Sequence, residues 1–182
     1  HQVMLIDPQL KQKIDRSGQL NGTSASLGVL MGHVFRRSNG RAWRLRKRSM
    51  EIWQQWIDSL STPEDPLTIK TPLVQLARSA EEALKMKKII EERTTLQLEI
   101  LTKDFTIKTS RLLPDIKYGG LISHQDGYID PLLLQHCLRK AFTRLHVDQV
   151  HEKVIRLERA KSSGQGRWMI HLANGKTLSK NY

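Results

Sequence analysis

The clearest pattern along the chain is a repeat of apolar residues with helical spacing between residues 41 and 60. Apolar side chains recur there every three or four positions, which predicts an amphipathic helix that ends before a Ser-Thr-Pro break. We expect its apolar stripe to consist of Leu45, Ile52, Trp53, Trp56, Ile57 and Leu60. A helix of this kind buries one face and leaves the other in solvent.

Two further helices are predicted by the residues at their N-termini. Ser79 is followed three residues later by Glu82, a capping pattern that predicts a helix from residue 80 to about residue 93. Asp130 precedes Pro131, which suits an N-cap followed by the first helical position. The leucine-rich segment that follows predicts a helix in which Cys137 belongs to the core. A shorter helix is predicted over residues 104–112.

Shorter apolar runs predict strands. Residues 3–6 form an unalternated run of the kind that parallel sheets bury on both faces. Residues 67–77 predict an edge strand or two short pieces, because Pro72 cannot donate a ladder hydrogen bond. A strand is expected from Gly119 to Ile122, broken by a turn at Asp126-Gly127. Strands at 147–150, 154–157 and 168–172 follow, with a hairpin turn at Asn174-Gly175. This alternation predicts a mixed α/β fold.

The charge changes this picture in one place. The 182 residues carry 30 Lys and Arg against 18 Asp and Glu, a net charge of +12. Seven cations without an acid lie between residues 36 and 48: Arg36, Arg37, Arg41, Arg44, Arg46, Lys47 and Arg48. One interpretation is a phosphate or nucleic-acid patch in which Trp43 stacks on a base. The apolar stripe that continues the segment favours the other interpretation, the solvated face of a basic helix.

Candidate binding chemistry is concentrated in residues 21–32, a segment of small and hydroxyl-bearing residues with three glycines. Such a segment lets the backbone approach a ligand closely and offers N–H and O–H donors to an anion. No metal-ligand motif, Gly-x-Ser-x-Gly elbow, P-loop or Gly-x-Gly-x-x-Gly fingerprint occurs in the sequence. No apolar run reaches the length of a membrane span. We therefore expect a cytoplasmic protein without a metal site.

The order of these features resembles the D-amino-acid-oxidase-like family of FAD-dependent oxidoreductases, of the glycine oxidase and sarcosine oxidase type. Two motifs carry the likeness: the loop at 22–30 after the strand at 3–6, and Asp126-Gly127-Tyr128-Ile129-Asp130-Pro131 before a helix. The resemblance implies a partial FAD-binding Rossmann-like domain joined to part of a β-rich substrate domain with antiparallel strands and covering helices. Residues 1–60 and 126–182 would belong to the FAD-binding domain and residues 61–125 to the substrate domain.

The resemblance also implies roles for individual residues. Asp7 would hydrogen-bond the adenosine ribose, and the backbone of Val154 would contact the adenine. The FAD pyrophosphate and ribityl chain would be met by Gly22, Thr23 and Ser24. The isoalloxazine ring would lie along Leu27, Gly28, Val29 and Leu30. Taken without the resemblance, Asp7 is a turn residue at a strand end and Val154 a core residue. No catalytic residue is assigned in this chain.

The function implied is oxidation of a small amine or amino acid by hydride transfer to flavin. The family's Gly-x-Gly-x-x-Gly loop and the arginine that clamps the substrate carboxylate are not in this sequence. We therefore expect the chain to be an internal segment of a longer enzyme, with weakened FAD binding when isolated. Two alternatives stay open: a basic nucleic-acid-binding (tRNA-binding) module, and a flavoprotein that acts on modified tRNA.

Overall fold

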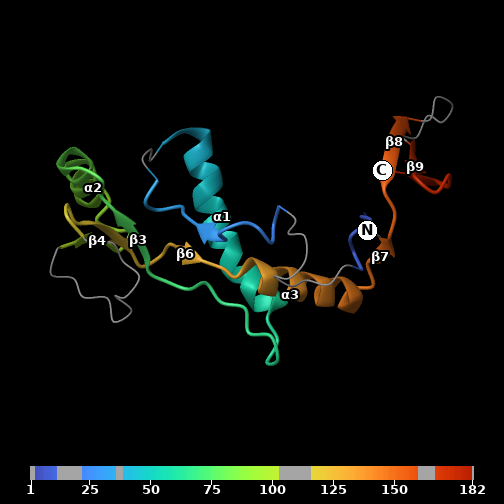
Figure 1. Cartoon of the computed structure of the whole chain (residues 1–182), viewed down its shortest axis with the longest axis horizontal. Coiled ribbons are helices and arrows are strands. Elements are labelled where there is room, and N and C mark those ends of the chain that lie inside the picture. The colour runs from blue at the N-terminus through green and yellow to red at the C-terminus, as the bar shows by residue number, and fades with distance from the viewer. Residues whose placement is uncertain (1–2, 12–21, 36–38, 103–115, 160–166, 182) are drawn as a thin grey trace. The chain divides into compact units, whose positions relative to one another are not determined.

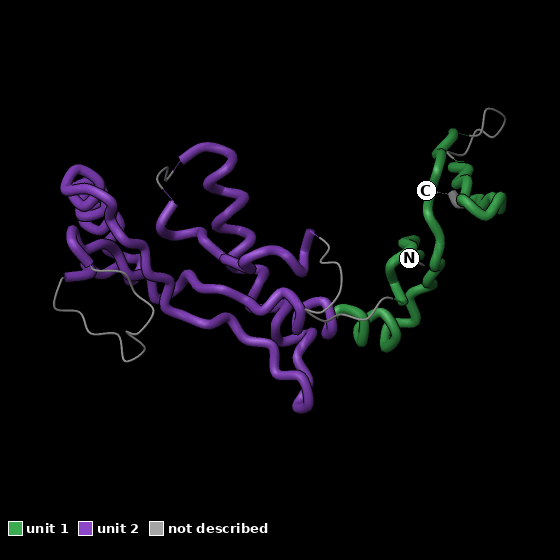
Figure 2. The backbone as a smooth tube through the Cα atoms, viewed as in Figure 1, with its two compact units in different colours: residues 1–19, 138–182 green, residues 20–137 purple. Residues whose placement is uncertain are grey.

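The computed structural model describes residues 3–11, 22–35, 39–102, 116–159 and 167–181. They form two compact units, residues 1–19 with 138–182 and residues 20–137 (Figure 2). The helix predicted over residues 104–112 lies outside the described residues, as do Asn21, Arg36, Arg37 and the loop at 161–166.

The larger unit contains a three-stranded antiparallel sheet in the order β3-β5-β4, covered by a helix (Figure 1). The strands are β3 (Leu73–Leu76), β4 (Leu98–Leu101) and β5 (Gly120–Ser123), and α2 (Ala80–Glu92) packs against β5 and β4. The core between helix and sheet consists of Val34, Ala77, Met86 and Leu121. The predicted cap is confirmed, because the Ser79 hydroxyl accepts the Glu82 N–H at 3.1 Å.

A second core in the same unit joins two helices to a short β-ribbon. The ribbon pairs β2 (Val29–Leu30) with β6 (Gly127–Tyr128), and the helices are α1 (Gly40–Leu60) and the first part of α3 (Pro131–Arg144). Its buried residues are Ile57, Leu67, Ile129 and Cys137. Cys137 is 1% exposed, which confirms the prediction that it is a core residue. The N-cap of α3 is also confirmed, since an Asp130 carboxylate oxygen accepts the Leu132 N–H at 2.9 Å.

The predicted apolar stripe of α1 is wrong at two of its six positions. Leu45 is 61% and Trp56 is 53% exposed. The inward face instead includes Trp43 and Arg46, both half-buried. The Arg46 guanidinium lies 3.7 Å from the centroid of the Phe35 ring, and this cation–π contact lets a charged residue take a place that periodicity assigns to an apolar one.

Two predictions near the β-ribbon need correction. The chain bends at His124 and Gln125, so that Asp126 is a buried residue leading into β6 and not part of a turn. The strand predicted over residues 67–77 is shorter, because only Leu73–Leu76 pairs with β5, as an edge strand beyond Pro72. That outcome agrees with the expectation for a proline-interrupted edge strand.

The smaller unit contains a parallel pair and an antiparallel sheet. β1 (Met4–Ile6) pairs in parallel with β7 (Asp148–Val150), as the apolar run predicted, although its side chains are half-buried and not fully buried. The antiparallel sheet has the order β10-β9-β8, from β8 (Val154–Arg159), β9 (Arg167–Leu172) and β10 (Thr177–Asn181). The turn at Asn174-Gly175 is confirmed between β9 and β10, where Gly175 has a φ of +82°. Within the described residues, no helix is both long and apolar enough to cross a membrane.

Candidate functional site

The segment Gly28–Leu30 is fastened to the Asp126–Pro131 motif by the β-ribbon. Val29 pairs with Tyr128 and Leu30 with Gly127. The Ile129 N–H donates to the Gly28 carbonyl at 3.0 Å. Gly28 has a φ of +64°, and a Cβ atom there would lie 2.0 Å from the Ile129 carbonyl oxygen. The two motifs on which the family resemblance rests therefore form one local structure, and that structure requires glycine at position 28.

One face of this ribbon is apolar and open to solvent. Directly paired residues on antiparallel strands project to the same face, so Val29 and Tyr128 lie side by side there. Their exposed fractions are 46% and 42%, and the neighbouring Leu27 is 83% exposed. The Lys70 ammonium lies 5.4 Å from the centroid of the Tyr128 ring. On the opposite face, Leu30 packs against the second core.

The loop before this ribbon, residues 22–26, carries the hydroxyl groups that were predicted from the sequence as donors to a ligand. Its residues Gly22 and Thr23 are exposed and Ser24 is half-buried. A turn closes the loop, with the Ser26 N–H donating to the Thr23 carbonyl at 3.1 Å. Among the described residues, a Cβ atom added to Gly22 would meet nothing within 4 Å, so that these residues leave the backbone there open to approach. Backbone and hydroxyl donors beside an exposed apolar face fit a ligand such as FAD, which joins a flat ring system to a phosphate-bearing chain.

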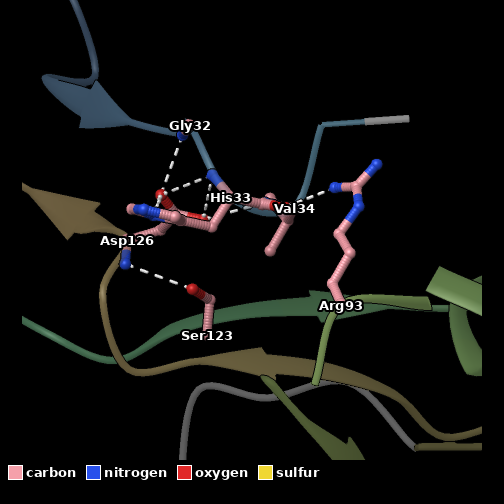
Figure 3. Close-up of polar contacts among 6 residues, drawn as sticks. All are labelled: Gly32, His33, Val34, Arg93, Ser123 and Asp126. Carbon is pink, nitrogen blue, oxygen red and sulfur yellow. Dashed lines mark hydrogen bonds and ion pairs between the residues drawn. The ribbon is translucent and has the colours of Figure 1, made fainter. Parts of the chain in front are cut away.

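The loop after β2 is held by a buried carboxylate (Figure 3). Asp126 has no solvent exposure, and its oxygens accept the backbone N–H groups of Gly32 at 2.8 Å and Val34 at 3.0 Å. The His33 N–H lies 3.1 and 3.0 Å from the two oxygens, and the His33 Nδ1 is 2.9 Å from Oδ1. The backbone N–H of Asp126 itself donates to the Ser123 hydroxyl at 3.2 Å. We call residues Gly32, His33, Val34 and Asp126 the carboxylate clamp.

The clamp keeps its carboxylate ionised. Burial by itself raises the pKa of Asp126, but the hydrogen bonds from the His33 side chain and from the N–H groups of Gly32 and His33 outweigh burial. The pKa therefore lies below its usual range. A buried cation lies nearby: the Arg93 guanidinium donates to the His33 carbonyl and lies 5.2 Å from the Trp43 ring centroid. Burial lowers the pKa of Arg93, against the opposing charges of Glu92 and Asp126.

A cavity of about 430 Å³ adjoins this loop in the larger unit. Its lining includes Met31, Val34 and Phe35 from this segment, together with Ser79, Met86 and Ile89. Val34, whose N–H the Asp126 carboxylate accepts, therefore also lines the pocket. Among the described residues, no group of three or more His, Cys, Asp and Glu side chains could hold a metal ion.

Two of the predicted cofactor-binding residues, Asp7 and Val154, lie in the smaller unit. Asp7 is exposed at the end of β1, where its N–H donates to the Val150 carbonyl at 3.1 Å. Its Oδ1 accepts the Gln9 N–H at 2.6 Å, the local turn that was the alternative interpretation of this residue. Val154 is half-buried at the start of β8 and pairs with Leu172. The other seven predicted residues all belong to the larger unit.

The basic stretch divides into an exposed and a packed part. Arg41, Arg44, Lys47 and Arg48 are exposed on α1, and Arg48 forms an ion pair with Glu51 at 3.2 Å. Trp43 is half-buried beneath Arg93, so it is not the exposed stacking ring of the nucleic-acid interpretation. The interpretation as the solvated face of a basic helix therefore fits these four cations better than a nucleic-acid patch with a stacking tryptophan.

Sequence reasoning missed the carboxylate clamp. Asp126 was marked only as a turn residue and as part of a motif, and neither His33 nor Arg93 was singled out. The one available signal is that Asp126 follows shortly after the predicted strand and directly precedes Gly127. This pattern predicts a turn as readily as a buried site residue. The partners of the Asp126 carboxylate lie more than 90 positions away along the chain.

Comparison with known proteins places these features in a family. The family model described as FAD dependent oxidoreductase (DAO) matches residues 3–179. No curated protein sequence matches the chain. Among solved structures, glycine oxidase from Geobacillus kaustophilus superposes with a TM-score of 0.73 at 16% identity, over 98% of this chain and 46% of that one.

Two other solved structures share the fold. Iminodiacetate oxidase from Chelativorans sp. gives a TM-score of 0.65 at 15% identity, covering 98% of this chain and 46% of that chain. L-alpha-glycerophosphate oxidase from Mycoplasma pneumoniae, with FAD bound, gives 0.65 at 18% identity, covering 94% and 43%. The chain thus spans somewhat less than half the length of these structures, and identities this low show the common fold alone.

Proposed function

Because the chain belongs to the family of FAD dependent oxidoreductases, we propose that it is part of an enzyme that oxidises a small amine or amino acid. FAD, when bound, supplies the redox chemistry by accepting a hydride from the substrate. The contribution of this chain is to bind and orient the cofactor. We assign it no catalytic acid or base.

The residues proposed to contact the cofactor are found in both units. In the larger unit, Gly22, Thr23 and Ser24 would offer N–H and hydroxyl donors to the pyrophosphate and ribityl chain. The isoalloxazine ring would lie along the residues from Leu27 to Leu30. In the smaller unit, the Asp7 carboxylate would accept a hydrogen bond from the adenosine ribose, and the Val154 backbone would contact the adenine.

The observation that carries this proposal is the solvent-exposed apolar face of the β-ribbon beside the hydroxyl-bearing loop. Exposed apolar side chains at adjacent positions indicate a surface that a ligand or partner covers. Leu27, Val29 and Tyr128 provide such a surface, and its neighbours on the chain are the donors of residues 22–24. FAD has a planar ring that suits the apolar face and a phosphate-bearing chain that suits the donors of residues 22–24.

The test is cofactor binding by the protein expressed from its complete reading frame. We expect the purified protein to carry the visible absorbance of oxidised flavin, which bleaches when a substrate amine is added anaerobically. Leu27→Asp should weaken FAD binding, because it places a charge on the apolar face. Leu84→Asp is the matched control, since Leu84 is 68% exposed on α2. Absence of flavin after reconstitution with FAD, or equal affinity in both variants, contradicts the proposal.

We also propose that the active enzyme is longer than these 182 residues. The coverage of 43–46% of the oxidase structures supports this proposal, as does the parallel pair β1–β7, in which the β1 side chains are half-buried where a larger parallel sheet would bury them. The mass of the native gene product tests it directly. A native product of this length that turns over substrate contradicts it.

A second candidate function, binding of RNA or another polyanion, is favoured by the exposed cations of α1. The test is charge reversal at Arg41, Arg44 and Lys47, with salt-dependent RNA binding as the readout. Arg46 is left unchanged because it packs on Phe35. Loss of RNA binding with intact flavin content would support a flavoprotein that acts on RNA. RNA binding that the triple variant retains contradicts this candidate.

A further inference from the structure

The carboxylate clamp satisfies every backbone N–H of three consecutive residues with one side chain. An ionised carboxylate only accepts hydrogen bonds and has about four lone-pair positions. In this protein those positions meet the N–H groups of Gly32, His33 and Val34 together with the His33 imidazole (Figure 3). Charge-assisted bonds of this kind are stronger than neutral ones. A loop without regular secondary structure is thereby fixed to the start of β6.

Arg93 holds the same loop from another direction. Its Nη1 donates to the His33 carbonyl, so that His33 is bound at its N–H, its carbonyl and its side chain. Arg93 is the residue that caps the C-terminus of α2 and is 6% exposed, and its guanidinium lies 5.2 Å from the centroid of the Trp43 ring of α1. The position of the loop is therefore set by two groups, the Asp126 carboxylate before β6 and the Arg93 guanidinium after α2.

The same motif that supplies the clamp also supplies the partner strand of the proposed isoalloxazine contact. Asp126 binds the residues after β2, while Tyr128 and Ile129 bind Val29 and Gly28. The segment from Gly28 to Val34 is thus held at both ends by residues 126–129. A shift of Asp126 would move β6, and with it the exposed face of Val29 and Tyr128.

We propose that Asp126 is a positioning residue for FAD, whose carboxylate fixes the segment that the isoalloxazine ring contacts. This role rests on the proposed function. It predicts that removing the negative charge changes cofactor affinity and flavin environment, and not only the stability of the fold. The carboxylate acts through the backbone of residues 28–34 and makes no contact with the flavin in this role.

The experiment compares Asp126→Asn with Ser123→Ala in the protein expressed from its complete reading frame. The asparagine has nearly the same shape, but its NH₂ group faces backbone donors and leaves at least one without an acceptor. Ser123→Ala is the matched control, because the serine is equally buried and binds the Asp126 backbone but not the loop. FAD dissociation constants, the shape of the bound-flavin visible band, and amide hydrogen exchange at residues 32–34 are measured.

We expect Asp126→Asn to change the band shape and to weaken FAD binding by about tenfold, because a tenfold loss corresponds to a segment that is correctly placed in only about one molecule in ten. Exchange at residues 32–34 should be faster. Ser123→Ala should keep wild-type affinity and band shape even where it lowers the unfolding midpoint. If Asp126→Asn does not fold, His33→Leu takes its place, because it removes one bond of the clamp and keeps the three backbone donors.

Three outcomes overturn the positioning role and a fourth overturns its premise, so that the two kinds of failure are distinguishable. Faster exchange in Asp126→Asn with wild-type affinity and band shape means that Asp126 serves stability alone. Equal losses of affinity in Asp126→Asn and Ser123→Ala mean the same. In the His33→Leu test, wild-type affinity and band shape overturn the role. A wild-type protein that binds no FAD instead overturns the proposed function, before any variant is compared.

Discussion

The two regions that would hold FAD are built in different ways. The strand end at Asp7 is exposed, and its carboxylate bonds to a backbone group two residues away. The loop around Asp126 is buried, and its carboxylate bonds to backbone groups 92 to 94 positions away. The first is a local turn that any chain with this short sequence can form. The second exists only when distant segments have folded together.

The two carboxylates therefore differ in whether they are available to a ligand and in how rigidly the protein holds them. An exposed carboxylate with a local partner is free to bind a ligand and contributes little to stability. A buried carboxylate with four donors is fully used by the protein and contributes to both stability and position. We therefore expect changes at Asp126 to lower both stability and cofactor affinity, and changes at Asp7 to lower cofactor affinity alone.

The largest expected effect is that of Asp126→Ala on folding. Removing the carboxylate leaves several buried donors without an acceptor, and we expect the free energy of unfolding to fall by about 3–5 kcal/mol. Urea denaturation measures it. Asp7→Ala is the matched control and should change stability by less than about 0.5 kcal/mol. Similar values for the two variants would remove the contrast between the regions.

The next effect concerns two glycines of the same loop. Gly28→Ala should lower the unfolding free energy by about 2–3 kcal/mol, because φ is +64° and the new methyl group meets the Ile129 carbonyl. Gly22→Ala should change it by less than about 0.5 kcal/mol, since no described residue lies within 4 Å of the added methyl group. Thermal unfolding of both variants measures the difference. A stable Gly28→Ala variant would show that the β-ribbon tolerates a different approach of its strands.

A smaller effect is expected from acid. Because the folded pKa of Asp126 lies below its usual value of about 4, its contribution is complete above that value. As the pH falls from about 4 through the folded pKa, that contribution is lost. His33 and Arg93 are the groups of opposite potential charge that lie nearest this carboxylate. Unfolding midpoints of wild type and Asp126→Asn should therefore converge as the pH is lowered, and parallel curves would contradict this assignment.

The smallest effect on stability is expected for Asp7→Asn. The exposed turn keeps an oxygen acceptor for Gln9, so the unfolding free energy should stay within about 0.5 kcal/mol of wild type. FAD affinity should nevertheless fall by about tenfold, because a ribose hydroxyl loses a charged acceptor. Equilibrium titration with FAD provides the measurement. Unchanged affinity would leave Asp7 as a turn residue only.

Much of the fold follows from short-range signals in the sequence. The caps at Ser79 and Asp130 and the hairpin turn at Asn174-Gly175 each depend on residues within about three positions, and all three are confirmed. The parallel pairing expected for the strand before Asp7 is confirmed as well. These features depend on backbone geometry and on groups that meet within a single turn.

Helix orientation and the clamp were decided at longer range. Periodicity alone put Leu45 and Trp56 on the buried face of α1, whereas Trp43 and Arg46 turn inward because Arg93 and Phe35 provide partners for them. Similarly, the dipeptide Asp126-Gly127 predicts a turn when only the local sequence is considered. In the folded protein Asp126 is buried instead, because the backbone N–H groups of residues 32–34 donate to its carboxylate.

The sequence by itself therefore determined where the three helices and most of the strands lie, the caps at Ser79 and Asp130, the turn at Asn174-Gly175, and the resemblance to a flavin-dependent family. The tertiary structure alone decided which aspartate is buried and which stays exposed. The physical reason is that the free-energy cost of burying a carboxylate is offset only when several hydrogen-bond donors converge on it. In this chain those donors come from residues that no local pattern connects to Asp126.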